Sequence, residues 1–146
     1  MKILEPHLIA GVRFVDDRGI LKAVKIPENF TVQRFYTVKN WTSGFVRAWH
    51  GHENESKLIY VSAGAGLIGV AKMLDRSIAK SSPQKYVLDA ESDKALLIPS
   101  GYANGLMSLT VDCEFTILSN ATLEQSQNDD FRFPPNELDI WNVEFR

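Results

Sequence analysis

The stretch KLIYVSAGAGLIGVAKM, residues 57–73, decides the fold class of this 146-residue chain. It contains two apolar runs, Lys57 to Val61 and Leu67 to Met73, on either side of an Ala-Gly-Ala-Gly segment. Short runs of this kind are typical of β-strands, and glycine readily adopts the positive φ of a tight turn. The stretch therefore predicts a β-hairpin with its turn at residues 63–66.

Similar short runs recur at near-regular intervals on both sides of this hairpin. They predict strands at Val12–Val15, Ile20–Ile26, Phe30–Val38, Phe45–Trp49, Lys85–Leu88, Ala95–Ile98, Asn104–Leu109, Glu114–Leu118 and Ile140–Phe145. Turn residues such as Asp16-Asp17-Arg18-Gly19 separate the runs, and no long segment repeats at helical spacing. One short helical turn is expected where Thr122 and Gln125 have the spacing of a capping box. The pattern favours a single all-β domain over residues 1–146, a small jelly-roll barrel.

Composition argues against several classes of function. The formal net charge of -2 provides no field for broad capture of nucleic acid or an acidic membrane. No apolar run approaches the length of about eighteen residues that a membrane span needs. The segment Met1 to Pro6 is too short for a signal peptide, and a single cysteine, Cys113, fits a reducing compartment. We expect a cytoplasmic protein with a small-molecule ligand and no nucleic-acid or membrane partner.

The segment Arg47-Ala48-Trp49-His50-Gly51-His52 is the strongest candidate for chemistry. Side chains two residues apart lie on the same side of a strand, so His50 and His52 are expected to face the same way as Ala48. A barrel interior that receives two imidazoles must be polar there, because apolar packing would leave their nitrogens unsatisfied. The other three residues are expected on the opposite face, unless a β-bulge re-aims one of them. The alternative is a pair of surface histidines on an edge strand.

Three more residues have both a functional and an ordinary interpretation. Lys57 either faces the pocket or points outward as a guard of an edge strand. Arg18 either binds a ligand or is the solvated tip of its turn. Asn104 follows the chain break Pro99-Ser100-Gly101, and either delivers an amide to a site or is an ordinary turn residue.

Two motifs resemble those of the cupin superfamily. Gly44, five further residues and then His50-Gly51-His52 with Glu55 are similar to the first motif. Pro99 to Asn104 is similar to the second, with Asn104 where cupins usually carry a metal-binding histidine.

A narrower resemblance covers most of the chain. The segments that resemble, in order, the dTDP-4-dehydrorhamnose 3,5-epimerases are Asp17-Arg18-Gly19, Arg47–His50, Lys57–Val61 and Ile98–Gly105. Gln33-Arg34-Phe35-Tyr36, together with Arg47 to His52, is similar to the dTDP-4-keto-6-deoxyglucose 3,4-ketoisomerases.

This resemblance implies a cupin jelly roll and a nucleotide-sugar epimerase or isomerase. Such an enzyme acts without a cofactor on a 4-keto-6-deoxyhexose nucleotide, in deoxysugar and polysaccharide biosynthesis. The catalytic positions implied are His50 as general base, His52 as second histidine of the ketoisomerase pair, Lys57 beside the sugar, and Tyr36. The positions implied to bind the substrate and its diphosphate are Arg18, Arg47, Tyr102 and Asn104.

The chain departs from the epimerase pattern in three places. Asn104 replaces the second epimerase histidine, and Glu114 to Leu123 contains no tyrosine to act as the acid. The chain also ends before the segment that supplies the aspartate partner of the catalytic histidine. The alternatives are a non-catalytic carbohydrate-binding cupin and a metal-dependent cupin enzyme with ligands His50, His52 and Glu55. We expect no metal, because the spacing from His52 to Glu55 is one residue shorter than in the common motif.

The same resemblance implies a homodimer. Cupins of this type exchange N-terminal strands between subunits, and the predicted hairpin before Phe30 is apolar along much of its length. We expect Arg18, at the tip of this hairpin, to reach the pocket of the partner subunit.

Overall fold

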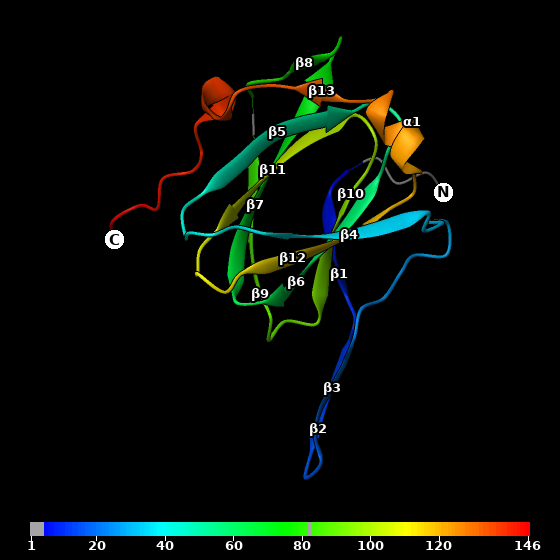
Figure 1. The fold of residues 1–146 in the computed structure, drawn as a ribbon, viewed down its shortest axis with the longest axis vertical. Coiled ribbons are helices and arrows are strands. Elements are labelled where there is room, and N and C mark those ends of the chain that lie inside the picture. The colour runs from blue at the N-terminus through cyan, green and yellow to red at the C-terminus, as the bar shows by residue number, and fades with distance from the viewer. Residues whose placement is uncertain (1–4, 82) are drawn as a thin grey trace.

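The computed structural model describes residues 5–81 and 83–146, in which β-strands form three sheets (Figure 1). The five-stranded sheet has the order β1 (His7–Ala10), β10 (Lys94–Ile98), β6 (Lys57–Ala63), β12 (Glu114–Ser119) and β4 (Arg34–Lys39). The six-stranded sheet has the order β13 (Phe131–Arg132), β5 (Val46–His52), β11 (Tyr102–Ser108), β7 (Ala65–Leu74) and β8 (Ser77–Ile78), with β9 (Gln84–Asp89) also paired to β7. Strands β2 (Val12–Asp16) and β3 (Gly19–Ala23) form a separate hairpin. The expected all-β fold is confirmed; the N-terminal residues 1–4, on which part of the signal-peptide argument depends, lie outside the described residues.

The main core lies between the two larger sheets. Ile59 of β6, Ile68 of β7 and Phe115 of β12 are fully buried there, each stabilising the fold by about 1.5–3 kcal/mol. A second apolar layer covers the outer face of the six-stranded sheet. In this layer the rings of Trp49 and Trp141 pack with centroids 5.2 Å apart. Strand β5 is therefore enclosed on its outer face by the C-terminal segment.

The hairpin predicted from residues 57–73 is wrong. Strand β6 pairs with β10 and β12 in one sheet, whereas β7 pairs with β11, β8 and β9 in the other. The expected tight turn is present at Gly64, whose φ of 63° is positive, but it carries the chain from one sheet to the other. Local sequence identifies both strands and their turn, but the partner of each strand depends on distant segments.

The C-terminal strand predicted at Ile140–Phe145 is also wrong. A short 3₁₀ helix, η1 (Pro135–Leu138), is followed by chain without strand pairing. Trp141 is only 7% exposed and lies against the paired glycines Gly69 and Gly105, where a Cβ atom would collide with its ring. Burial of its ring thus accounts for the apolar residue Trp141 in this segment, whereas Phe145 is exposed.

Two smaller expectations have opposite outcomes. The strand predicted from Phe30 begins only at Arg34, the first residue of β4. The capping box is confirmed: Thr122 accepts from the backbone N–H of Gln125, and the Gln125 side chain accepts from the backbone N–H of Thr122. It starts helix α1 (Leu123–Gln127). Among the described residues, no helix has the length and apolar character needed to cross a membrane.

The β2–β3 hairpin projects away from the sheets (Figure 1). Four of its large apolar side chains, Phe14, Val15, Ile20 and Leu21, are each between 58% and 62% exposed. In the isolated chain this hairpin presents an uncovered apolar strip, a feature of surfaces that pack against another molecule.

Candidate active site

A pocket of about 550 Å³ opens between β4, β5, β11 and α1. Six of the residues predicted to act in catalysis or substrate binding line it: Tyr36, Arg47, His50, His52, Lys57 and Asn104. Residues from five strands, together with α1, therefore surround one cavity, of the size that small-molecule sites have.

A β-bulge in β5 decides which side chains face the pocket. His50 pairs with Asn104 of β11, but Arg47 pairs with Leu106, so β5 has one extra residue between the two pairs. The bulge places Arg47 on the pocket face with the histidines, and places Ala48 beside Trp49 in the outer apolar layer. The inward position predicted for Ala48 and the outward position predicted for Arg47 are both wrong, because the extra residue reverses the alternation.

A backbone carbonyl group determines which ring nitrogen of neutral His52 carries the hydrogen. Its side chain is 6% exposed, and Nδ1 lies 2.6 Å from the carbonyl oxygen of Asp129. A carbonyl oxygen only accepts, so Nδ1 must carry the hydrogen and the neutral ring keeps its lone pair on Nε2. Burial, reinforced by Lys57, lowers the pKa of His52, whereas Glu55 and Asp129 oppose that change. Buried Nε2 has no hydrogen-bond partner in the described part of the chain.

His50 lies in the same pocket, between Asn104 on β11 and Arg132 on β13. Burial lowers its pKa first, and the charges of Lys57 and Arg132 lower it further; Asp130 opposes them. An imidazole with a lowered pKa is neutral near pH 7, so His50 is able to accept a proton.

Lys57 faces the pocket and is not an edge guard. It is 7% exposed, and its Nζ donates to Oδ1 of Asn104 at 3.4 Å. Burial lowers the pKa of Lys57, although the nearby carboxylate of Glu55 opposes this. Strand β6 is central in its sheet, so alternation directs every second side chain toward the enclosed side.

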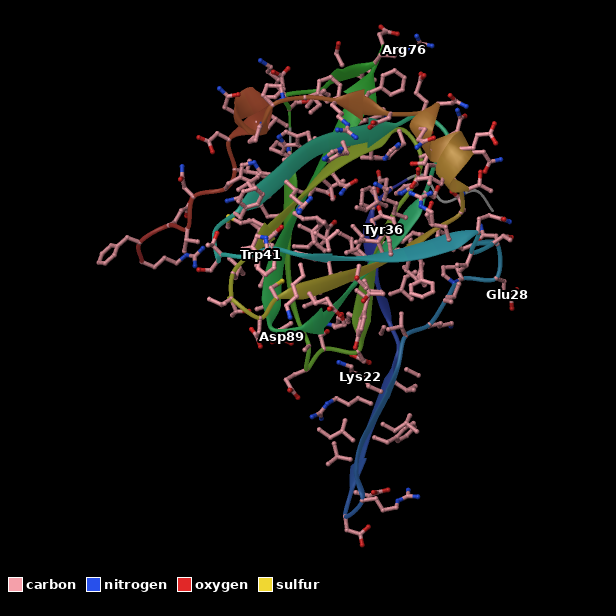
Figure 2. The ribbon with its side chains drawn as sticks, in the orientation of Figure 1. Lys22, Glu28, Tyr36, Trp41, Arg76 and Asp89 are labelled. Carbon is pink, nitrogen blue, oxygen red and sulfur yellow. The ribbon has the colours of Figure 1, made fainter. Side chains whose placement is uncertain are left out.

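Tyr36 supplies a hydroxyl from β4, on the side that faces the other sheet (Figure 2). Burial, with a smaller contribution from Glu55, raises its pKa to about 12, so the phenol is protonated and able to donate. The Arg34 guanidinium lies 5.1 Å from the centre of its ring. Arg34 also donates to the carbonyl oxygen of Ala121 and to Oγ of Ser126, which ties α1 to β4.

Two predicted binding residues lie outside this pocket. Arg18 is at the tip of the β2–β3 hairpin, with its side chain 87% exposed and paired to Asp16 at 2.6 Å. This ion pair holds the pKa of Asp16 below its usual value. Tyr102 packs against the core between the sheets.

Five polar pocket residues were missed by the sequence interpretation: Arg34, Ser126, Gln127, Asp130 and Arg132. Arg34 was detectable, because it lies two residues before Tyr36 on the same face of one strand. Arg132 reaches the site only because β13 pairs with β5 opposite His50. No local signal indicates that pairing.

The described residues contain no cluster of three or more His, Cys, Asp or Glu side chains suited to hold a metal ion. Glu55, a ligand in the metal-dependent alternative, instead has one carboxylate oxygen bonded to Ser119 Oγ. The donor set of that alternative is therefore not assembled here.

Two imidazoles and the buried Lys57 amine share this pocket, a set of groups suited to moving a proton next to a carbonyl. A family model described as dTDP-4-dehydrorhamnose 3,5-epimerase matches residues 2–144. The chain belongs to this family, as its sequence motifs predict. No curated protein matches the chain.

Solved structures are similar at low sequence identity. A dTDP-4-dehydrorhamnose 3,5-epimerase from Bacillus anthracis, with TDP and PPi bound, has 21% identity and a TM-score of 0.75, over 86% of this chain and 76% of that one. A TDP-quinovose 3,4-ketoisomerase from Campylobacter jejuni has 17% identity and a TM-score of 0.73, over 94% and 99%. A 3'-monoepimerase from Streptomyces bikiniensis, in complex with dTDP-quinovose, has 19% identity and a TM-score of 0.79, over 98% and 76%. These likenesses establish the fold.

Proposed function

We propose that this member of the family isomerises a nucleotide-linked 4-keto-6-deoxyhexose, with His50 as the base that removes a proton beside the keto group. The observation that carries the proposal is the pair of imidazoles, half-buried His50 and buried His52, that line one pocket with Lys57. This arrangement combines proton acceptors with a cation in an enclosed site, the requirements of chemistry next to a carbonyl.

The 4-keto group makes the proton on the neighbouring carbon acidic. Neutral His50 takes that proton, and the resulting enolate needs a hydrogen-bond donor or positive charge at its oxygen. Lys57 or Arg47 supplies this charge, a contribution often worth about 3–4 kcal/mol in enzymes. Asn104 is unable to replace a histidine as base, because an amide has no useful proton affinity near neutral pH.

The fate of the proton separates the two activities of this class. Return of a proton to the opposite face of the same carbon gives epimerisation. Transfer between C3 and C4 gives ketoisomerisation and needs a second proton carrier. His52, on the same pocket face as His50, favours ketoisomerisation.

We assign binding of the diphosphate to Arg47 and to Arg18 of the partner subunit. Arg47 lines the pocket and is oriented by Asn40, whose Oδ1 accepts from its Nε at 2.7 Å. Asn104, which lines the pocket, is assigned to the sugar. Arginine suits a diphosphate because its planar fork binds two oxygens together.

A homodimer completes this assignment. The exposed apolar strip of the β2–β3 hairpin supports it, because a second copy of the chain would cover the strip. We expect a dimer at micromolar concentration by analytical ultracentrifugation, and a monomer would contradict the assignment of Arg18. We also place the protein in the cytoplasm, in keeping with its single buried cysteine, Cys113; fractionation of cells that express it tests this location.

Proton exchange in deuterated solvent tests the function. dTDP-, UDP- and GDP-linked 4-keto-6-deoxyhexoses are each incubated with the protein, and deuterium at C3 and C5 is read by NMR. We expect incorporation at C3 and a 3-keto product with one of these nucleotides. Binding of a nucleotide sugar without any exchange would make the protein a carbohydrate-binding cupin instead.

A further inference from the structure

One buried charge next to the pocket has no role in the mechanism above. Glu55 lies in the loop after β5, and its side chain is 0% exposed. One of its carboxylate oxygens, Oε1, has no hydrogen-bond partner in the described part of the chain. A buried carboxylate costs several kcal/mol unless neighbouring groups compensate it. The surroundings of Glu55 therefore indicate what it does.

The two carboxylate oxygens of Glu55 face different groups. Oε2 accepts from Oγ of Ser119 at 2.9 Å and lies 3.6 Å from Nη2 of Arg34. Oε1 lies 3.7 Å from Nδ1 of His52. One oxygen is thus anchored, and the other is directed at the imidazole.

Asp129, after α1, holds both partners of this contact in place. Its carboxylate accepts from the backbone N–H groups of Glu53, Asn54 and Glu55 at 2.8, 2.9 and 2.9 Å. Its carbonyl oxygen accepts from Nδ1 of His52 at 2.6 Å. A single residue therefore fixes the loop that carries Glu55 and the orientation of the His52 ring.

We propose that Glu55 is a positioning residue that stabilises the imidazolium form of His52, so that His52 serves as the acid of the reaction. This rests on the proposed ketoisomerase activity. A carboxylate beside a histidine stabilises its protonated form in many enzymes, without itself taking the proton. Of the charged groups around His52, Lys57 disfavours the imidazolium, whereas Glu55 and Asp129 favour it. Arg34 lies on the far side of Glu55.

The proton balance assigns one role to each histidine. The C3–H bond breaks, its proton goes to His50 and its electron pair forms the C3–C4 enediolate. His52 enters the cycle as the imidazolium that Glu55 stabilises, so a C4–H bond then forms with the proton of its Nε2, while the hydroxyl proton of O3 passes to O4. Finally, His50 loses its proton to solvent and His52 takes one up from solvent, which restores both histidines. Without Glu55, the step that forms the C4–H bond lacks its acid.

The variant Glu55→Gln keeps the shape of the side chain and removes its charge. With the dTDP-linked 4-keto sugar, we expect exchange at C3 to continue, while formation of the 3-keto product falls roughly tenfold or more at unchanged KM. NMR of ¹⁵N-labelled histidine should show His52 losing its proton at a lower pH than in the wild type. The matched control is Glu53→Gln, which removes an exposed carboxylate of the same loop that pairs with Arg76. It should change neither readout.

Wild-type product formation by Glu55→Gln, or an unchanged His52 titration, would overturn this proposal while leaving the function intact. If Glu55→Gln does not fold, Glu55→Asp is used, which keeps the charge and should retain most product formation. The wild-type NMR titration is a further test, since His52 should hold its proton to a higher pH than His50. The reverse order contradicts the role of Glu55. If the wild type exchanges no proton with any sugar, the function is wrong, and the two titrations still decide the effect of Glu55 on His52.

Discussion

The two faces of strand β5 have opposite surroundings. On the outer face, Trp49 is fully buried against Trp141 in an apolar layer. On the inner face, His50 and His52 line a pocket with Lys57, where burial shifts the pKa of all three groups toward their neutral forms. Burying such polar groups costs free energy, which the apolar face of the same strand offsets. We therefore expect mutations on the outer face to reduce stability and mutations on the inner face to reduce activity.

The largest effect is expected from Trp49→Ala on the outer face. Loss of a fully buried indole should reduce the free energy of unfolding by about 3–5 kcal/mol, as measured by urea denaturation. The control is Trp41→Ala, because Trp41 is 99% exposed in the loop after β4 (Figure 2). That variant should stay within about 0.5 kcal/mol of the wild type. Equal losses from both variants would refute the assignment of the outer layer as a structural support.

On the inner face, His50→Asn should abolish exchange at C3 by at least about a hundredfold, the usual range for loss of a general base. The unfolding free energy of this variant should not fall, because the His50 ring has no hydrogen bond to any of the described residues. Nucleotide affinity, measured by calorimetry, should change little, because the diphosphate is assigned to arginines. Exchange at the wild-type rate would place the base elsewhere.

His52→Asn should separate the two steps of the reaction. Exchange at C3 should continue, because His50 is intact, but transfer to C4 should stop. NMR of the sugar product in deuterated solvent distinguishes the two outcomes. Loss of both exchange and transfer would show that His52 is itself the first base.

The smallest effect concerns pH. Both histidines have a folded-state pKa below the ordinary value of 6.5, so the unfolded chain binds more protons than the folded one in this range. Their contribution to stability is fully present above pH 6.5 and is lost as the pH falls through the folded-state values. The unfolding free energy should therefore decrease below pH 6.5. It should decrease less steeply in a His50→Asn/His52→Asn double variant, and equal slopes would contradict this origin.

Alternation and turn chemistry in the sequence determined most of the longer strands, the capping box at Thr122 and the shared face of His50 and His52. These features depend on residues a few positions apart, whose side-chain directions follow from backbone geometry. The motifs around Arg47 and Lys57 also indicated the family, which the family model confirms.

Only the tertiary structure decided which distant segments meet. It separated β6 from β7, placed Trp141 on Gly69 and Gly105, and re-aimed Arg47 through a bulge. It also brought Asp129 to His52, a contact between residues 77 positions apart. Such contacts depend on strand pairing and on the packing of whole faces. No local periodicity in the chain records either of these.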